Sequence, residues 1–316
     1  MKVVYVTGCL GFIGSYITKT CLELGWYVKG VDKITYAANR DLLIEFKKYK
    51  NFSFVHCDIN ELKFLYECDY VINTAAETHV GNSIFESQVF IESNIKGVHN
   101  ILELIKNHKT ESNQKPILIH LSTDEVYGDI LVGKHNEEDL LKPSNPYSAT
   151  KASADMLINA WARTYDLPYI ILRPTNNYGV GQYIEKLIPK VCKYLKLGKK
   201  IPLHNGGLPV RNWLHAQDTA NAVITIINSG VVNEIFNISG GFEQDNLTTV
   251  KKIFTVSGID TNQIDEYIDF STVRPGQDVR YDLDDSKLRK LGWIPQKNFD
   301  EELPKIIEYY NDKFIW

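Results

Sequence analysis

The sequence contains few cysteines, and none of them is arranged like a metal site. The five are Cys9, Cys21, Cys57, Cys68 and Cys192, with no C-x-x-C motif and no cysteine–histidine cluster. This scatter argues against a zinc site and against a disulfide framework, and it favours a reducing compartment. No metal is expected.

The chain also lacks a long apolar segment and an excess of positive charge. The apolar run 3–6 gives way to glycine too early for the hydrophobic region of a signal peptide. No run is long enough to cross a bilayer. The net charge of −4 leaves no basic footprint for nucleic acid. We therefore expect a soluble cytoplasmic protein that binds neither membranes nor nucleic acid.

The chain has an ordinary globular composition, with one unusual strand end. Of its 316 residues, 44% are hydrophobic and 23% charged, enough for a large core in one or two domains. The run 116–121 predicts a strand buried on both faces, and Ser122, Thr123, Asp124 and Glu125 follow it at once. Adjacent carboxylates at such an edge suit acid/base chemistry, although a solvated strand exit would explain them too.

A glycine-rich loop lies between the first predicted strand, 3–6, and the first predicted helix. Its pattern is G-x-x-G-x-x-G, formed by Gly8, Gly11 and Gly14, with Phe12 and Ile13 between them. Glycines let a backbone approach a pyrophosphate, and a helix N-terminus offers free N–H groups. A tight turn alone would also explain the glycines, so the fold around them matters.

Three further strand ends carry residues that suit a dinucleotide. The strand 27–31 ends at Asp32, about 20 residues after the glycine loop, where a carboxylate bonds a ribose hydroxyl. The cofactor set from these ends is Asp32, Lys33, Asp58, Ile59, Ala75 and Ala76. Asp32 favours NAD over NADP because it repels a 2′-phosphate, and Lys33 weakens that preference. Four strand–helix repeats predict an α/β fold with a doubly wound parallel sheet.

A long helix is predicted over 87–107, where apolar residues recur at helical spacing. The residues expected to be buried are Val89, Ile91, Ile95, Val98, Leu102 and Ile105.

Tyr147 and Lys151 are four residues apart, so on a helix they share a face. A cation beside a phenol lowers the pKa of the tyrosine, which would make Tyr147 a general base near neutral pH. Taken alone, the pair has a simpler explanation, which is a tyrosine and a lysine exposed on a surface helix. The dinucleotide fold and the hydroxyl of Thr123 favour a catalytic role for the pair.

These motifs resemble the extended short-chain dehydrogenase/reductase family. The similarity rests on the glycine loop, the Tyr147–Lys151 pair and the Arg173-Pro174 step, and it extends over nearly the whole chain. Segments 75–80, 122–128, 173–179 and 185–190 are similar to nucleotide-sugar 4,6-dehydratases acting on dTDP- or UDP-glucose. The resemblance implies a Rossmann domain with a smaller α/β substrate domain, and it adds Asn94, Ser122, Tyr147 and Lys151 to the NAD-binding set.

The resemblance also implies a mechanism. Tyr147, helped by Lys151 and Thr123, would take the proton of the sugar 4-hydroxyl while hydride passes from C4 to NAD. Glu125 would then remove the C5 proton while Asp124 protonates the departing C6 hydroxyl. Hydride returns to C6 and leaves a 4-keto-6-deoxy sugar nucleotide, an intermediate for deoxysugars such as rhamnose.

The second half of the chain is expected to hold the sugar nucleotide. The resemblance implies an NAD domain over 1–174, rejoined by 212–238, and a substrate domain from 175–211 and 239–316. The substrate set is Glu77, Asn176, Lys186, Arg211, Asn246 and Arg274. The chain departs from the family pattern at Gly81, usually aspartate, and at Gln277, usually histidine. The family commonly forms homodimers through the helices before and containing the Tyr–Lys pair.

Two alternatives remain open. A 4-epimerase or a decarboxylase would need Tyr147, Lys151 and NAD but would leave Asp124 and Glu125 without a role. A non-catalytic NAD-binding scaffold is the third possibility. The sequence does not distinguish uridine from thymidine nucleotides.

Overall fold

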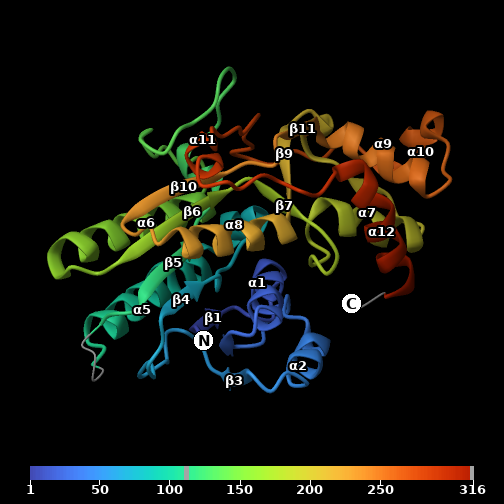
Figure 1. Ribbon diagram of the computed structural model, residues 1–316. Helices are drawn as coiled ribbons and strands as arrows, with labels where there is room; N and C mark the ends of the chain where they lie inside the picture. The colour runs from blue at the N-terminus through green and yellow to red at the C-terminus, as the bar shows by residue number, and fades with distance from the viewer. Residues whose placement is uncertain (110–113, 314–316) are drawn as a thin grey trace.

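A seven-stranded parallel sheet forms the centre of the molecule (Figure 1). The computed structural model describes residues 1–109 and 114–313. The strands, in sheet order, are β10 (Glu234–Ile238), β6 (Tyr169–Pro174), β5 (Ile117–Leu121), β4 (Tyr70–Asn73), β1 (Val3–Thr7), β2 (Tyr27–Asp32) and β3 (Phe52–His56). The strand order reverses at β1, which pairs in parallel with both β2 and β4. The predicted doubly wound sheet is confirmed.

Helices cover both faces of this sheet. On one face α1 (Phe12–Glu23) contacts α8 (Ala216–Ser229), and on the other α5 (Gly97–Lys106) contacts α6 (Pro146–Tyr165) (Figure 1). A separate apolar core fills each face. This double burial explains why the strands are almost continuously apolar in the sequence. The short helix α2 (Arg40–Phe46) follows β2.

The rest of the chain forms a smaller α/β region at the carboxyl edge of the large sheet (Figure 1). Its strands are β7 (Asn176–Tyr178), β9 (Val210–His215) and β11 (Phe242–Asp245) in one sheet, and β8 (Ile201–Pro202) and β12 (Ile268–Asp269) in another. Its helical segments are α7 (Leu187–Lys196), η3 (His204–Gly207), α9 (Asn246–Val256), η4 (Thr261–Gln263), α10 (Ile264–Tyr267) and α12 (Phe299–Asp312). The short helix α11 (Ser286–Arg289) instead contacts β10, and its Leu288 belongs to the core on the α1 face of the large sheet. Helices α7, α9 and α12 share one apolar core.

The predicted helix 87–107 is divided into three consecutive segments. These are α4 (Ser87–Phe90), the π-helical η1 (Ile91–Lys96) and α5, preceded by α3 (Val80–Phe85). A π-turn has one residue more than a turn of α-helix. The apolar residues that precede η1 therefore point to a different side from those of α5. The predicted burial of Val89 and Ile91 is wrong, since they are 37% and 40% exposed.

A second difference concerns the connection between β3 and β4. The sequence suggested a strand–helix repeat here, but residues 57–69 contain no helix. Instead, Leu62 and Leu65 in this segment are buried in the core that covers the α5 face of the sheet. The connection is short, and its two leucines fill the place of a helix.

Candidate active site

The glycine loop joins β1 to α1 and packs against the end of β4. Gly8 has a φ of +69°, and a Cβ on it would lie 2.8 Å from the backbone nitrogen of Ala75. A Cβ on Gly14 would overlap the carbonyl oxygen of Gly8. Gly11 is the N-cap of α1 and has no side chain, so no N-cap side chain pairs with the first N–H groups of this helix. These features fit a dinucleotide diphosphate.

Asp32, at the end of β2, fixes the glycine loop. Its carboxylate accepts hydrogen bonds from the backbone N–H of Leu10 at 3.0 Å and of Ile34 at 2.7 Å. The neighbouring Lys33 places its Nζ 3.2 Å from an oxygen of Asp58. Asp58 therefore offsets the charge of Lys33, the residue that could have attracted a 2′-phosphate.

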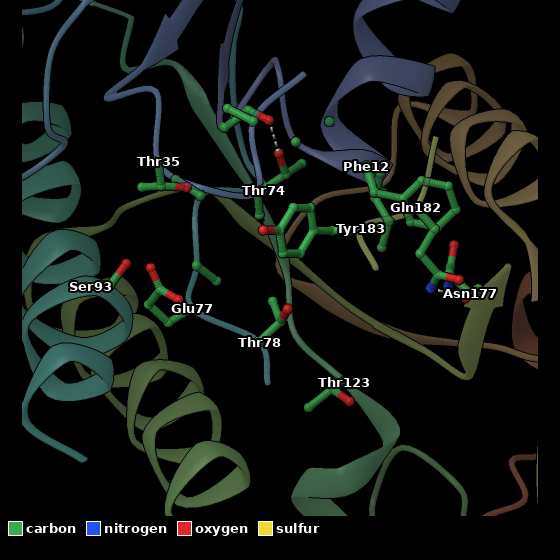
Figure 2. A pocket seen from close by; sticks show the side chains of 18 of the residues that line it. Phe12, Thr35, Thr74, Glu77, Thr78, Ser93, Thr123, Asn177, Gln182 and Tyr183 are labelled. Atoms are coloured by element: carbon green, nitrogen blue, oxygen red, sulfur yellow. Dashed lines mark hydrogen bonds between the residues drawn. The ribbon is translucent and has the colours of Figure 1, made fainter. Parts of the chain in front are cut away.

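One cavity connects the glycine loop to the acidic strand end, and Figure 2 shows it. It spans about 1410 Å³ including its open mouth. Thirteen predicted cofactor residues line it: Gly8, Gly11, Phe12, Ile13, Gly14, Asp32, Lys33, Asp58, Ile59, Ala75, Ala76, Ser122 and Tyr147. The cavity lies at the carboxyl ends of the strands, where open α/β sheets bind ligands.

Two predicted cofactor residues, Asn94 and Lys151, lie behind this lining. Asn94 in η1 is buried, and its amide pairs with the backbone N–H and carbonyl of Glu77 at 2.9 and 3.0 Å. It also donates to the hydroxyl of Thr150 in α6 at 3.0 Å. Asn94 thus holds the segment after β4 against α6 and shapes the cavity wall.

Asp124 begins the short helical turn η2 (Asp124–Tyr127), which follows β5. Thr123 is the N-cap of this turn, and its hydroxyl donates to Asp124 Oδ1 at 3.0 Å. Asp124 is 2% exposed, and its other oxygen is buried without a hydrogen-bond partner among the described residues. Burial, with the negative charge of Glu125, raises the pKa of Asp124 to about 8. Asp124 is therefore protonated at neutral pH and can act as an acid.

Glu125 has a different environment from its neighbour. Burial raises the pKa of Glu125, but the charge of Arg211 and a hydrogen bond from Asn145 Nδ2 at 3.2 Å lower it. Asn145 is the N-cap of α6, so the start of this helix also orients the glutamate. Two adjacent carboxyls with unlike surroundings suit one acid and one base.

Tyr147 and Lys151 lie on one face of α6, as predicted, and both are buried. The predicted lowering of the tyrosine pKa is wrong for this state of the protein. Burial raises the pKa of Tyr147, with Glu125 adding to it and the Thr123 hydroxyl opposing it. Lys151 Nζ instead donates to the carbonyl oxygen of Leu121 at 2.5 Å, and burial lowers its pKa to about 8.

The predicted substrate residues fall into two groups. Glu77, Asn176 and Lys186 line the cavity, and Lys186 Nζ donates to the carbonyl oxygen of Thr78 at 2.8 Å. The Asn176 side-chain oxygen is buried without a hydrogen-bond partner in the described ranges.

Arg211, Asn246 and Arg274 lie outside the lining of this cavity. The charges of Arg211 and Arg274 nevertheless reach Glu125, whose pKa both lower. Arg211 lies over the ring of Tyr281 at 4.9 Å and donates to the carbonyl of Asp278 at 3.2 Å. Asn246 starts α9, where its backbone N–H donates to Pro209. The structure does not bring Asn246 into the cavity.

Part of the cavity wall comes from residues that the sequence did not predict. Thr35, Ala37 and Ala38 come from the loop after β2, and Gln182, Tyr183 and Glu185 from the segment after β7. In Figure 2, Gln182 and Tyr183 project into the same space as Phe12 and Thr123. The rings of Tyr36 and Tyr183 are 5.3 Å apart and link the two loops. No periodic or motif signal marks these residues, because loop contacts between distant segments depend on the whole fold.

Comparisons with known proteins agree with this geometry. The family model for GDP-mannose 4,6 dehydratase matches residues 5–306. The chain belongs to this family. It is 38% identical to the dTDP-glucose 4,6-dehydratase of Haemophilus influenzae, over 98% of each chain.

Two further relatives bear on the nucleotide and the fold. The trifunctional UDP-glucose 4,6-dehydratase/UDP-4-keto-6-deoxy-D-glucose 3,5-epimerase/UDP-4-keto-L-rhamnose-reductase RHM3 of Arabidopsis thaliana is 39% identical over all of this chain, which spans 48% of it. The crystal structure of DesIV, a dTDP-glucose 4,6-dehydratase from Streptomyces venezuelae with NAD and TYD bound, has a TM-score of 0.91 and 34% identity, covering 98% and 97% of the two chains.

These findings confirm the predicted family, the extended short-chain dehydrogenase/reductase fold and an enzyme of the nucleotide-sugar 4,6-dehydratase type. The prediction of NAD as cofactor agrees with them. Across residues 1–109 and 114–313, this dehydratase contains no helix that is long and apolar enough to span a membrane.

Proposed function

We propose that this enzyme converts a nucleoside-diphosphate-glucose, either dTDP-glucose or UDP-glucose, into the 4-keto-6-deoxy sugar nucleotide. The observation that carries the proposal is the pair Asp124 and Glu125, which line the cavity beside Tyr147. Burial and the neighbouring carboxylate keep Asp124 protonated. Burial also raises the pKa of Glu125, but the charge of Arg211 and the hydrogen bond from Asn145 oppose that rise. Removing water from a sugar needs both an acid and a base at the same time.

Each residue of the site has a role in this proposal. Tyr147 accepts the proton of the sugar 4-hydroxyl; burial raises its pKa in the protein without ligands, the Thr123 hydroxyl opposes that rise, and Lys151 lies one helical turn along the same face of α6. The glycine loop and Asp32 would hold NAD, which would supply the hydride acceptor for oxidation at C4. Glu125 removes the proton at C5, which the 4-ketone has acidified. Asp124 gives its proton to the C6 hydroxyl, which leaves as water.

We propose that the sugar nucleotide lies between the NAD domain (1–174 and 212–238) and the substrate domain (175–211 and 239–316). Lys186 is in the cavity wall, and Arg211 and Arg274 lie near enough to Glu125 to act on its charge. Positive side chains on that side suit a diphosphate. The relatives' names include both dTDP and UDP substrates, so the base is left to experiment.

We also propose a homodimer and a cytoplasmic location. Phe85 at the end of α3, Val89 in α4 and Met156 in α6 are 92%, 37% and 55% exposed. Helices α3 and α4 both contact α6, so these apolar side chains belong to neighbouring elements. All five cysteines are free thiols, which suits a reducing compartment.

The test is incubation of the purified protein, with and without added NAD, with dTDP-glucose and UDP-glucose in separate reactions. Mass spectrometry of the product should show the loss of one water with at least one nucleotide. The matched variant carries Asp124→Asn and Glu125→Gln together. In this variant water loss should stop, while oxidation at C4 should continue. The proposal would be overturned in favour of an epimerase if neither the wild type nor the double variant released water and the double variant still interconverted C4 epimers.

A further inference from the structure

A row of buried polar side chains crosses the sheet directly behind the active site. Thr7, Asn73 and His120 are in register on the adjacent strands β1, β4 and β5. All three are at most 1% exposed. Two residues earlier on these strands, the same face carries Tyr5, Val71 and Leu118, which belong to an apolar core. Polar side chains in this row therefore need internal partners.

The partners form a continuous chain that ends at Lys151. The Thr7 hydroxyl lies 2.6 Å from Asn73 Oδ1, and Asn73 Nδ2 lies 3.0 Å from His120 Nδ1. The other ring nitrogen of His120, Nε2, lies 3.3 Å from Lys151 Nζ. No other role described for the site uses His120, which does not line the cavity.

The direction of the hydrogen bonds along this chain depends on the charge of Lys151. With Asn73 Nδ2 donating to Nδ1, the neutral imidazole carries its proton on Nε2, and only an uncharged Lys151 amine can accept it. With an ammonium at Lys151, Nε2 must accept, so Nδ1 carries the proton. The Asn73 amide then turns by a half rotation and presents its oxygen. The same four groups thus have one arrangement for each charge state of the lysine.

Other charged groups near Lys151 act on the same equilibrium. Asp155, one helical turn further along α6, raises the pKa of Lys151, and it is itself paired with Arg173 of β6 at 3.0 Å. Burial and the lysine charge lower the pKa of His120, so its imidazole stays neutral. Tyr147 is the remaining titratable group on this face of α6.

We propose that His120 is a positioning residue that orients the Lys151 ammonium and links it, through Asn73, to Thr7 at the base of the glycine loop. The inference rests on the proposed function for its kinetic consequence. Its structural content, a neutral imidazole whose tautomer follows the charge of Lys151, is independent of the substrate.

The kinetic test uses three substitutions of His120. His120→Gln keeps an amide near the position of Nε2, His120→Asn keeps one near Nδ1, and His120→Phe keeps neither. We expect His120→Phe to lower kcat about tenfold to a hundredfold with KM unchanged, because the lysine is displaced but the cavity is not. His120→Gln should recover part of this loss, and His120→Asn should not. Leu118→Val, on the same strand and face, is the matched control and should keep the wild-type kcat.

The pH dependence should be measured where Asp124 cannot contribute. In the background of Asp124→Asn with Glu125→Gln, the absorbance of NADH reports C4 oxidation alone. In this background, His120→Phe should shift the alkaline limb of the pH profile for C4 oxidation to lower pH, because the Lys151 ammonium loses a hydrogen-bond acceptor. A kcat within twofold of wild type with an unmoved limb would overturn the proposal. If His120→Phe does not fold, equal kcat values for the Gln and Asn variants would overturn it.

A spectroscopic measurement separates this proposal from the proposed function. In protein labelled with ¹⁵N-histidine, the His120 signals are those missing from His120→Gln. We expect Nδ1 to carry the proton below the pKa of Lys151 and Nε2 to gain it above. In the wild type, a tautomer that does not change with pH would overturn the inference. So would a change of tautomer that persists at the same pH in Lys151→Met. A wild-type enzyme that releases no water from any sugar nucleotide would overturn only the proposed function.

Discussion

At the scale of single residues, Asp124 and Lys151 together set how the activity depends on pH, and Asp124 supplies the acid. Burial and the charge of Glu125 raise its pKa to about 8, so it holds a proton at neutral pH. We expect kcat for water loss to fall at least about tenfold per pH unit above that value, because Asp124 loses its proton and Lys151, whose pKa burial lowers to about 8, loses its charge in the same range. The profile should be recorded from product mass. A kcat that stays constant up to pH ~10 would contradict this role.

The same carboxyl should affect stability in the opposite sense to a salt-bridged aspartate. Its pKa in the folded protein is above the ordinary value of 3.8, so the folded state binds the extra proton. The free energy of unfolding should therefore fall as pH rises from about 4 to about 8. Asp124→Asn should flatten this dependence and raise Tm by a few degrees at alkaline pH, while water loss drops ~100-fold or more. Asp312→Asn, at an exposed position, should leave the Tm profile unchanged.

At the scale of elements, the glycine that begins α5 allows this helix to pack beside the cofactor site. Gly97, the first residue of α5, faces Ile59, and a Cβ on it would overlap the end of the Ile59 side chain. Ile59 also lines the cavity. The glycine thus allows α5 to lie close to the segment that shapes the cofactor wall.

Gly97→Ala should therefore weaken both the fold and cofactor binding. We expect a loss of about 1–3 kcal/mol in the free energy of unfolding and a weaker affinity for NAD, measured by denaturation and by calorimetry. Ile59→Val removes the nearer of the two atoms in the way, Cδ1, and keeps Cγ1, so the double variant Gly97→Ala with Ile59→Val should recover part of the stability. Additive losses in the double variant would show that the contact with Ile59 is not the cause.

Much of the site could be predicted from the sequence because its strongest signals are local. The glycine loop, the acidic end of β5 and the Tyr147–Lys151 spacing each lie within a few consecutive residues, and strand polarity gathers strand ends at one edge. The remainder depends on contacts between distant segments. Tyr183 enters the wall from the region after β7, Asn94 acts by holding Glu77, and Lys151 turns toward Leu121. A π-turn likewise gives no periodic signal by which to place Val89.

At the scale of the whole molecule, the proposed dimer can be tested through its apolar surface. Phe85 is 92% exposed on α3, beside α6. Phe85→Glu would place a charge in a buried interface, so we expect the mass in light scattering to fall from two chains to one. Leu131→Glu, a substitution of similar chemistry at a position 72% exposed in the loop after η2, should leave the mass unchanged. A Phe85→Glu protein that keeps the wild-type mass would place the interface elsewhere.

The position of β10 has a consequence for how the enzyme is made. This edge strand pairs with β6, yet the chain between them, from 175 to 233, includes the first strands and helices of the smaller region. A ribosome must therefore synthesise part of the second region before the large sheet can be completed. Until then β6 is an open edge with unpaired backbone groups, a site for association with other nascent chains. A chain terminated after residue 174 should accumulate as aggregates, whereas chaperones that shield strand edges should raise the yield of the full chain.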